Sequence, residues 1–303
     1  MGINGFRKSY WLIFLAALWM AVVSVDTGFT ASETFKVSWD PTLVRPGSVI
    51  PVKVTASVEL ERTDAISVNG NFPLIKNGKG EYVALVGIAS IFKGPVYHLD
   101  FNLFPSGATD PYILDADLEL PVRTGKPARK QALSLPTKMV HLSEKKLTQV
   151  QLDSRSFWKI LRKRTSERYW RDSFRLPLKG RISTRFGVRR ILNGVPKRPH
   201  GGIDIAAPKG SAIAAANRGV VAMAVEFYLL GRTVVLDHGW GIYTVYAHQD
   251  SIDVMEGQLL ERGQILGRVG TSGRVTGPHL HFGTFIRGAK VNPEQLIKAT
   301  TGF

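Results

Sequence analysis

The stretches GPHLHFGTFI (residues 277–286) and HGGIDI (residues 200–205) decide the fold of the C-terminal part of the chain. In each, side chains that can bind a metal ion alternate with apolar side chains, which is the two-residue period of a β-strand. His279 and His281 therefore share one face of a strand, and Asp204 lies on the face opposite to the isoleucines beside it. Both stretches predict strands with one apolar face and one polar face.

The rest of the sequence has the same β character. Residues 174–303 contain short apolar runs between closely spaced glycines, and a single helix is expected over residues 293–299, which indicates an antiparallel sheet. Residues 32–122 alternate apolar and polar positions between recurring turn signals, which favours a β-sandwich. We therefore expect a mostly β protein with a β-sandwich-like domain at 32–122, a basic and partly helical linker at 123–173, and a β-sheet domain at 174–303.

The linker contains an amphipathic pattern over residues 143–170. Apolar residues recur there at intervals of three and four, and Lys and Arg occupy the other face, so the pattern predicts a helix. Such a stripe either packs on a neighbouring domain or lies on an anionic membrane. Packing on a neighbouring domain is the favoured interpretation, because core-facing stripes are far commoner. A helix that directly precedes the C-terminal domain is also a candidate to cover its groove.

The basic excess of the chain is local. The formal net charge is +16, and residues 123–190 hold 20 Lys and Arg against 4 Asp and Glu. This stretch either is a solvated linker or binds a polyanion such as a membrane surface, a wall polymer or nucleic acid. No nucleic-acid partner is expected, since the N-terminus predicts export.

The N-terminus has the pattern of an export signal over residues 1–28. Arg7 and Lys8 precede an apolar run at residues 11–25, which is short for a membrane span and suits a signal peptide. The run is followed by no clear cleavage motif, so an uncleaved anchor in the inner membrane is the alternative. Either interpretation places the rest of the chain in the periplasm or cell envelope.

The histidines are concentrated in the C-terminal domain, where five of the seven lie between His200 and His281. The chain has no cysteine, so disulfides and thiolate chemistry are excluded and a metal ion must be held by nitrogen and oxygen. A catalytic metal needs about three protein ligands and one open position, which two histidines and Asp204 can provide. His248, at the end of a strand, adds a further imidazole. The spacing alone leaves open whether His279 or His281 binds the metal.

Three separated stretches now carry a family resemblance. HGGIDIAAPKGSAI (200–213), GRTVVLDHGWGIYTVYAH (231–248) and GQILGRVGTSGRVTGPHLHF (263–282) resemble the lysostaphin-like, or LytM-type, zinc metallopeptidases, and the match extends over residues 174–297. The resemblance implies a β-sheet groove with one zinc ion on its floor, held by His200, Asp204 and His281. It implies that His248 and His279 are the catalytic pair. More weakly, residues 32–122 resemble bacterial immunoglobulin-like spacer domains.

The resemblance implies an endopeptidase that hydrolyses the peptide cross-links of bacterial peptidoglycan. Some members cut glycine bridges and others cut direct D-alanyl cross-links. The alternative is a catalytically silent member that binds and regulates other cell-wall hydrolases. The chain departs from the family pattern at residues 230–233 and at Gly283, which favours altered substrate preference over lost activity. In some members an asparagine in the loop before the first ligand blocks the zinc, and Asn193 lies in that loop without being assigned this role.

Overall fold

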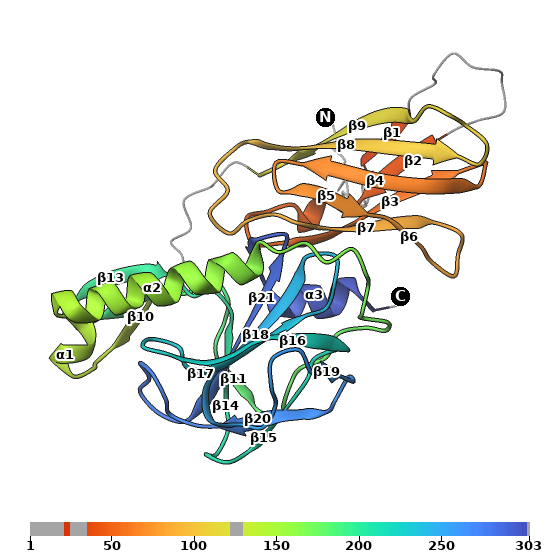
Figure 1. Ribbon diagram of the computed structural model, residues 1–303. Coiled ribbons are helices and arrows are strands. Elements are labelled where there is room, and N and C mark those ends of the chain that lie inside the picture. Colours follow the sequence, from red (N-terminus) through yellow and green to blue (C-terminus); the bar gives the residue numbers. More distant parts are fainter. Residues whose placement is uncertain (1–20, 25–34, 122–129, 302–303) are drawn as a thin grey trace, which may run out of the picture.

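The computed structural model describes residues 21–24, 35–121 and 130–301, and it is mostly β with antiparallel sheets, which confirms the predicted fold class (Figure 1). The N-terminal domain holds two sheets whose strands bury alternate residues, so the sheets face each other across one core. The first sheet has the order β1 (Ala21–Ser24), β2 (Phe35–Trp39), β3 (Val49–Ala56), β7 (Tyr82–Gly87) and β6 (Ile75–Lys76). The second has the order β5 (Gly70–Pro73), β4 (Leu60–Ser67), β8 (Val96–Pro105) and β9 (Tyr112–Glu119). A 3-10 turn, η1 (Pro41–Leu43), connects β2 and β3.

The end of the predicted export signal takes part in this domain. Residues 21–24, the last part of the apolar run, form β1 and pair with β2 at the edge of the first sheet. The earlier part of the run lies outside the described residues. Within the part of the chain that the structure describes, no helix is both long and apolar enough to cross a membrane.

The C-terminal domain is built on a ten-stranded sheet with a small three-stranded sheet beside it. The main path of the large sheet is β11 (Arg181–Thr184), β14 (Ile203–Ala206), β21 (His279–Ile286), β18 (Ile242–Ile252), β17 (Gly231–Asp237), β16 (Gly219–Phe227) and β19 (Leu259–Leu260). Beside this path lie β15 (Ala212–Ala214), β20 (Ile265–Val269) and β22 (Ala289–Val291). The small sheet holds β10 (Lys130–Leu133), β12 (Arg189–Leu192) and β13 (Val195–Pro199). The helix predicted near the C-terminus is confirmed as α3 (Pro293–Ala299), which Asn292 caps with its side chain.

The linker contains a short helix, α1 (Thr137–Val140), and the long helix α2 (Glu144–Leu161). The prediction that α2 continues to residue 170 is wrong, because the following residues run in extended form beside the β17–β18 turn and pair with Gly239 and Trp240. The favoured interpretation of the apolar stripe is confirmed, since Phe157 and Trp158 pack edge-on against Phe285 of β21. The stripe packs only in its second half.

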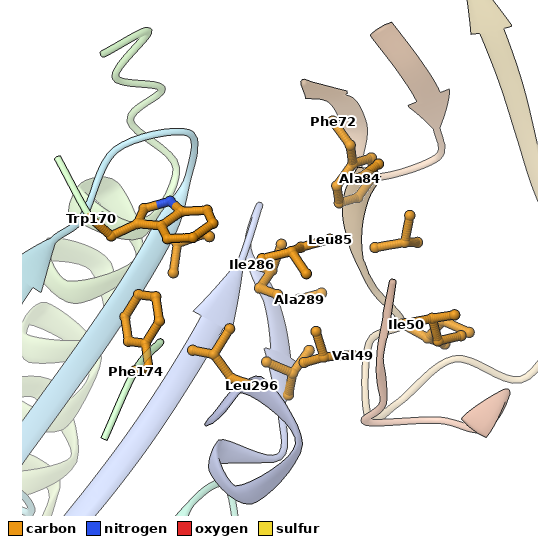
Figure 2. Close-up of a cluster of buried hydrophobic side chains, with 14 of the residues drawn as sticks. Val49, Ile50, Phe72, Ala84, Leu85, Trp170, Phe174, Ile286, Ala289 and Leu296 are labelled. Atoms are coloured by element: carbon orange, nitrogen blue, oxygen red, sulfur yellow. The ribbon is translucent and has the colours of Figure 1, made fainter. Parts of the chain in front are cut away.

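The two domains share a continuous apolar junction (Figure 2). Val49 and Leu85 of the sandwich face Ile286, Ala289 and Leu296 of the C-terminal domain. Hydrogen bonds cross the junction, from the Val49 amide to Gln295 Oε1 (3.1 Å) and from the Asn292 amide to the Gly47 carbonyl (2.8 Å). Gly87 permits the close approach, because a Cβ at this position would lie 2.8 Å from the Ile286 Cβ. The sandwich is therefore packed against the C-terminal domain and is not a free spacer.

Candidate metal centre

Strand pairing brings three of the predicted site residues together. Asp204 of β14 lies directly opposite His281 of β21, and His279 lies opposite Ala206. Residues opposite each other in an antiparallel pair share a face, so the two histidines and the aspartate project from the same side of the sheet. Leu280 and Phe282, which alternate with the histidines, are buried on the other side.

The backbone before β14 positions His200. Its amide donates to the Val188 carbonyl, and its own carbonyl accepts from the Gly187 amide. Gly202 allows this segment to lie against β21, since a Cβ there would be 2.3 Å from the Phe282 carbonyl oxygen. The second glycine of the HGGID motif is therefore required by a backbone contact.

A β-bulge turns His248 toward the same site. Ala247 lies opposite His281, so in a regular strand the next residue would point to the other face of the sheet. The pairing of β18 with β17 shifts here by one residue, and His248 has a φ of 66°, which is rare for a residue other than glycine. Bulges commonly re-aim side chains next to active sites, and the ring of His248 lies 4.9 Å from that of His279.

Three ligand atoms converge closely enough to hold one metal ion. His200 Nε2 lies 3.0 Å from His281 Nδ1, and Asp204 Oδ1 lies 2.9 Å from each of these nitrogens. A tetrahedral site with metal–ligand bonds of about 2.0–2.1 Å separates its ligand atoms by roughly 3.3 Å, so the triangle is only slightly tighter. A cation between these atoms would satisfy all three lone pairs at once. Two imidazoles and one carboxylate also match the donor set of a catalytic zinc site.

Carbonyl groups fix which nitrogen faces the site in three of the four imidazoles. The Nδ1 atoms of His200, His248 and His279 donate to the carbonyls of Arg185 (3.1 Å), Ser272 (2.9 Å) and Gly277 (2.8 Å). Their Nε2 atoms therefore carry the free lone pair, as expected for metal ligands and bases held by a second layer of hydrogen bonds. His279 Nε2 is buried without a hydrogen-bond partner among the described residues and lies 3.8 Å from Asp204 Oδ1.

Burial favours the neutral form of two of the imidazoles, those of His248 and His281. It lowers the pKa of His248 to about 3, with a further contribution from the neighbouring histidines, and lowers the pKa of His281 to about 4 despite the opposing effect of Asp204. Burial alone would raise the pKa of Asp204, but hydrogen bonds from His200 and His281 outweigh it and hold that pKa below its usual range. At neutral pH the centre thus places the neutral His281 ring beside the Asp204 carboxylate anion.

The site opens into a cavity of about 540 Å³ whose walls come from separate parts of the chain. Leu229 and Leu230 of the β16–β17 turn line one wall, and Gln131, Leu133 and Leu135 line another. The helix considered as a cover for the groove is α2, but no residue of α2 lines this cavity; the linker reaches it through Gln131, Leu133 and Leu135 instead.

Asn193 holds this linker segment in place. Its Oδ1 accepts from the Leu135 amide (2.9 Å), and its Nδ2 donates to the Leu135 carbonyl (2.7 Å). The Asn193 side chain is thereby engaged away from the three candidate ligands.

Sequence analysis missed the cationic side chains of the cavity. Arg190 contacts Asp204 Oδ2, and Arg274 lies in the loop between β20 and β21. Arg274 falls within one of the stretches that resemble the family, so a place near the site could have been predicted for it. Arg190 is one of many arginines in the basic stretch, and nothing in the sequence distinguishes it from them.

The other histidines lie away from the centre. His238 is fully buried between the Arg218 carbonyl (2.8 Å) and Thr244 Oγ1 (2.7 Å), which agrees with a structural role. His98 is on the surface of the sandwich, where it pairs with Asp100 and Asp117.

Comparisons with known proteins confirm the resemblance. Residues 198–293 match the model of peptidase family M23. Peptidoglycan DD-endopeptidase ShyA of Vibrio cholerae is 44% identical over 131 residues, which are 43% of this chain and 29% of that protein. DD-carboxypeptidase/endopeptidase Mpg of Neisseria meningitidis is 40% identical over 120 residues, 40% of this chain and 28% of that protein. The matched region thus spans less than a third of the length of these curated relatives.

A solved structure supports the fold over most of the chain. The crystal structure of a protein described as a peptidase M23 from Pseudomonas aeruginosa superposes with a TM-score of 0.64 at 24% identity. It covers 85% of this chain and 97% of that chain. The shared fold therefore includes residues outside the M23 match.

Proposed function

We propose that the protein is a zinc-dependent endopeptidase that hydrolyses peptide cross-links of bacterial peptidoglycan, a premise supported by the match of residues 198–293 to peptidase family M23. The observation that carries the proposal is the convergence of His200, Asp204 and His281 within hydrogen-bonding distance of one another, beside the two further imidazoles of His248 and His279. The substrate class is inferred from the names of the relatives, a peptidoglycan DD-endopeptidase of Vibrio and a DD-carboxypeptidase/endopeptidase of Neisseria.

The chain provides the parts that a metallopeptidase needs. His200, Asp204 and His281 would hold the ion, which suits zinc because two imidazoles and a carboxylate leave one position open. A zinc ion bound there would polarise the scissile carbonyl and lower the pKa of the attacking water. The peptide would lie in the cavity beside the triangle, which Leu229 and Leu230 help to line.

His248 and His279 would handle protons. Both present Nε2 to the site with Nδ1–H fixed on a carbonyl, so a neutral ring can take the proton of the attacking water at Nε2. Once protonated, the same nitrogen can donate to the leaving amine, and a neighbouring N–H can donate to the developing oxyanion. The low pKa of His248, caused by burial, keeps this ring unprotonated at neutral pH.

We also propose an extracytoplasmic location, on the strength of the basic flank and apolar run in residues 1–28. The exposed basic side chains of α2 and of the segment after it would hold the enzyme near an anionic wall or membrane surface. Arg155, Lys159 and Arg162 are exposed and line one shallow depression beside Trp158.

Cleavage of purified peptidoglycan by the full chain tests the proposal, with fragments identified by mass spectrometry. We expect the zinc-loaded protein to convert cross-linked dimers to monomers, and a chelator to stop the reaction. His279→Gln should retain one zinc per chain and lose about 100-fold or more in rate, whereas His281→Ala should lose the zinc itself. Folded, zinc-loaded protein that cleaves no cross-link would overturn the proposal and favour a regulator of other hydrolases.

A further inference from the structure

The cavity around the metal centre is strongly cationic. Five Lys and Arg side chains line it against a single carboxylate, Asp204, which already belongs to the candidate ligand set. The five cations are Arg190, Lys197, Arg198, Arg274 and Lys290. A metal ion would add further positive charge. The lining of the cavity has no carboxylate besides Asp204 to neutralise these side chains. A substrate that carries negative charge would supply their counter-ion.

Among these five cations, Arg274 is the one best positioned to bind an anion. Its backbone amide is anchored on the Leu229 carbonyl (2.9 Å), and its guanidinium reaches the Met139 carbonyl at 3.5 Å. Among the described residues no carboxylate lies within 4.0 Å of it. Burial, together with the nearby Arg190, lowers the pKa of Arg274. A partly buried arginine without an acidic partner has lost hydration without compensation.

Arg190 is the cation of the set that contacts a candidate ligand. One end of its guanidinium contacts Asp204, while its Nε is buried without a hydrogen-bond partner in the described part of the chain. Arg190 and Arg274 line the same cavity. A carboxylate that enters this cavity can therefore be bound by a guanidinium, which matches its planar shape.

We propose that Arg274 binds a free carboxylate on the carbon atom attached to the leaving nitrogen, and thereby selects the substrate. The inference rests on the proposed peptidase function. Since Arg274 lines the same cavity as the three candidate ligands, we place the recognised carboxylate next to the scissile bond. On the acyl side the α-carboxyl is the scissile carbonyl itself, so only the residue that leaves can carry a free α-carboxylate there.

The chemistry separates the two kinds of cross-link. In a direct D-alanyl cross-link the leaving nitrogen can sit on a carbon that bears a carboxylate, whereas a glycine bridge is uncharged next to the scissile bond. The same recognition suits the last residue of a linear peptide, so the site should also remove a C-terminal residue. In both cases water adds its hydroxyl to the carbonyl carbon and a proton to the nitrogen as the amide bond breaks. One arginine would thus support endopeptidase and carboxypeptidase action.

Two synthetic peptides that differ in one group test this role. One has a free α-carboxylate on the leaving residue, and the other has a carboxamide there. We expect the zinc-loaded full chain to prefer the acid in kcat/KM by about 10- to 150-fold, the range for hydrogen bonds to a charged group. Arg274→Gln should reduce this preference below about threefold, and Arg274→Lys should restore part of it. Arg262→Gln, which alters an exposed arginine beside Asp172, should leave both the preference and the rate unchanged.

The outcomes separate the inference from the proposed function. Equal cleavage of both peptides by the unaltered chain, or an unchanged preference in Arg274→Gln, would overturn the role of Arg274 while leaving the peptidase intact. An equal loss of kcat/KM on both peptides in Arg274→Gln, with the zinc content unchanged, would also overturn the role of Arg274. Arg274 would then position the loop without binding the carboxylate of the substrate. Failure of the zinc-loaded chain on both peptides and on peptidoglycan would instead overturn the proposed function.

Discussion

Leu85→Ala tests whether the sandwich and the C-terminal domain unfold as one unit. Leu85 is 6% exposed and lies in β7 of the sandwich, where it faces Ile286 of β21 across the junction (Figure 2). Both residues border a small void that also touches Trp170. The side chains around it come from three sheets and two connecting segments, so they are not expected to move together to fill the space that leucine leaves. We therefore expect the substitution to retain most of its cavity.

The magnitude follows from the loss of apolar contact and the cavity that remains. Leu→Ala substitutions in cores cost about 2–5 kcal/mol, more where the site cannot collapse. A value of about 3 kcal/mol is expected at this nearly buried position. If unfolding is cooperative across the junction, the same loss applies to the C-terminal domain, although Leu85 is not part of it.

Hydrogen exchange of the slowest backbone amides measures this loss separately in each domain. In the range where exchange reports the opening equilibrium, about 3 kcal/mol corresponds to roughly 150-fold faster exchange of the core amides of β18 and β21. Ile113→Ala is the matched control, since Ile113 is in the same domain but 65% exposed, and it should change exchange little. Unchanged protection of β21 in Leu85→Ala, with faster exchange confined to the sandwich, would refute cooperative unfolding.

Two further predictions concern charge. Burial lowers the pKa of His238 to about 4 from about 6.5 in the unfolded chain, so below pH 6.5 the unfolded state binds a proton that the folded state does not. The free energy of unfolding is therefore unaffected by this group above pH 6.5 and falls by up to about 1.4 kcal/mol per pH unit from pH 6.5 down to pH 4. Urea unfolding of the metal-free protein should show a smaller dependence of this free energy on pH in His238→Gln. An equal dependence in both proteins would contradict the buried, neutral state of His238. Replacing Arg155, Lys159 and Arg162 of the exposed α2 surface by glutamine should weaken co-sedimentation with anionic vesicles or purified walls. Binding by the unaltered chain that persists at 1 M salt would exclude this electrostatic account.

The sequence by itself determined the local arrangement of the site. The alternation in HLHF places His279 and His281 on one face, and the same period separates Asp204 from its isoleucines, because side-chain direction in a strand depends only on position along it. The Asn-Pro pair at residues 292–293 similarly determined where α3 begins, since a side-chain cap and a proline act on their own helix turn. These features are local, so one sequence was enough to predict them.

Tertiary structure alone decided the remaining features of the site and of the fold. His248 reaches the centre through a bulge whose left-handed backbone is stabilised by pairing with two other strands, and a regular strand would have turned it away. Arg190 and Arg274 become a pair only when β12 and the loop before β21 meet in one cavity. The docking of the sandwich likewise depends on packing between distant segments. Contacts between residues far apart in sequence leave no periodic pattern, so their effect appears only once the chain is folded.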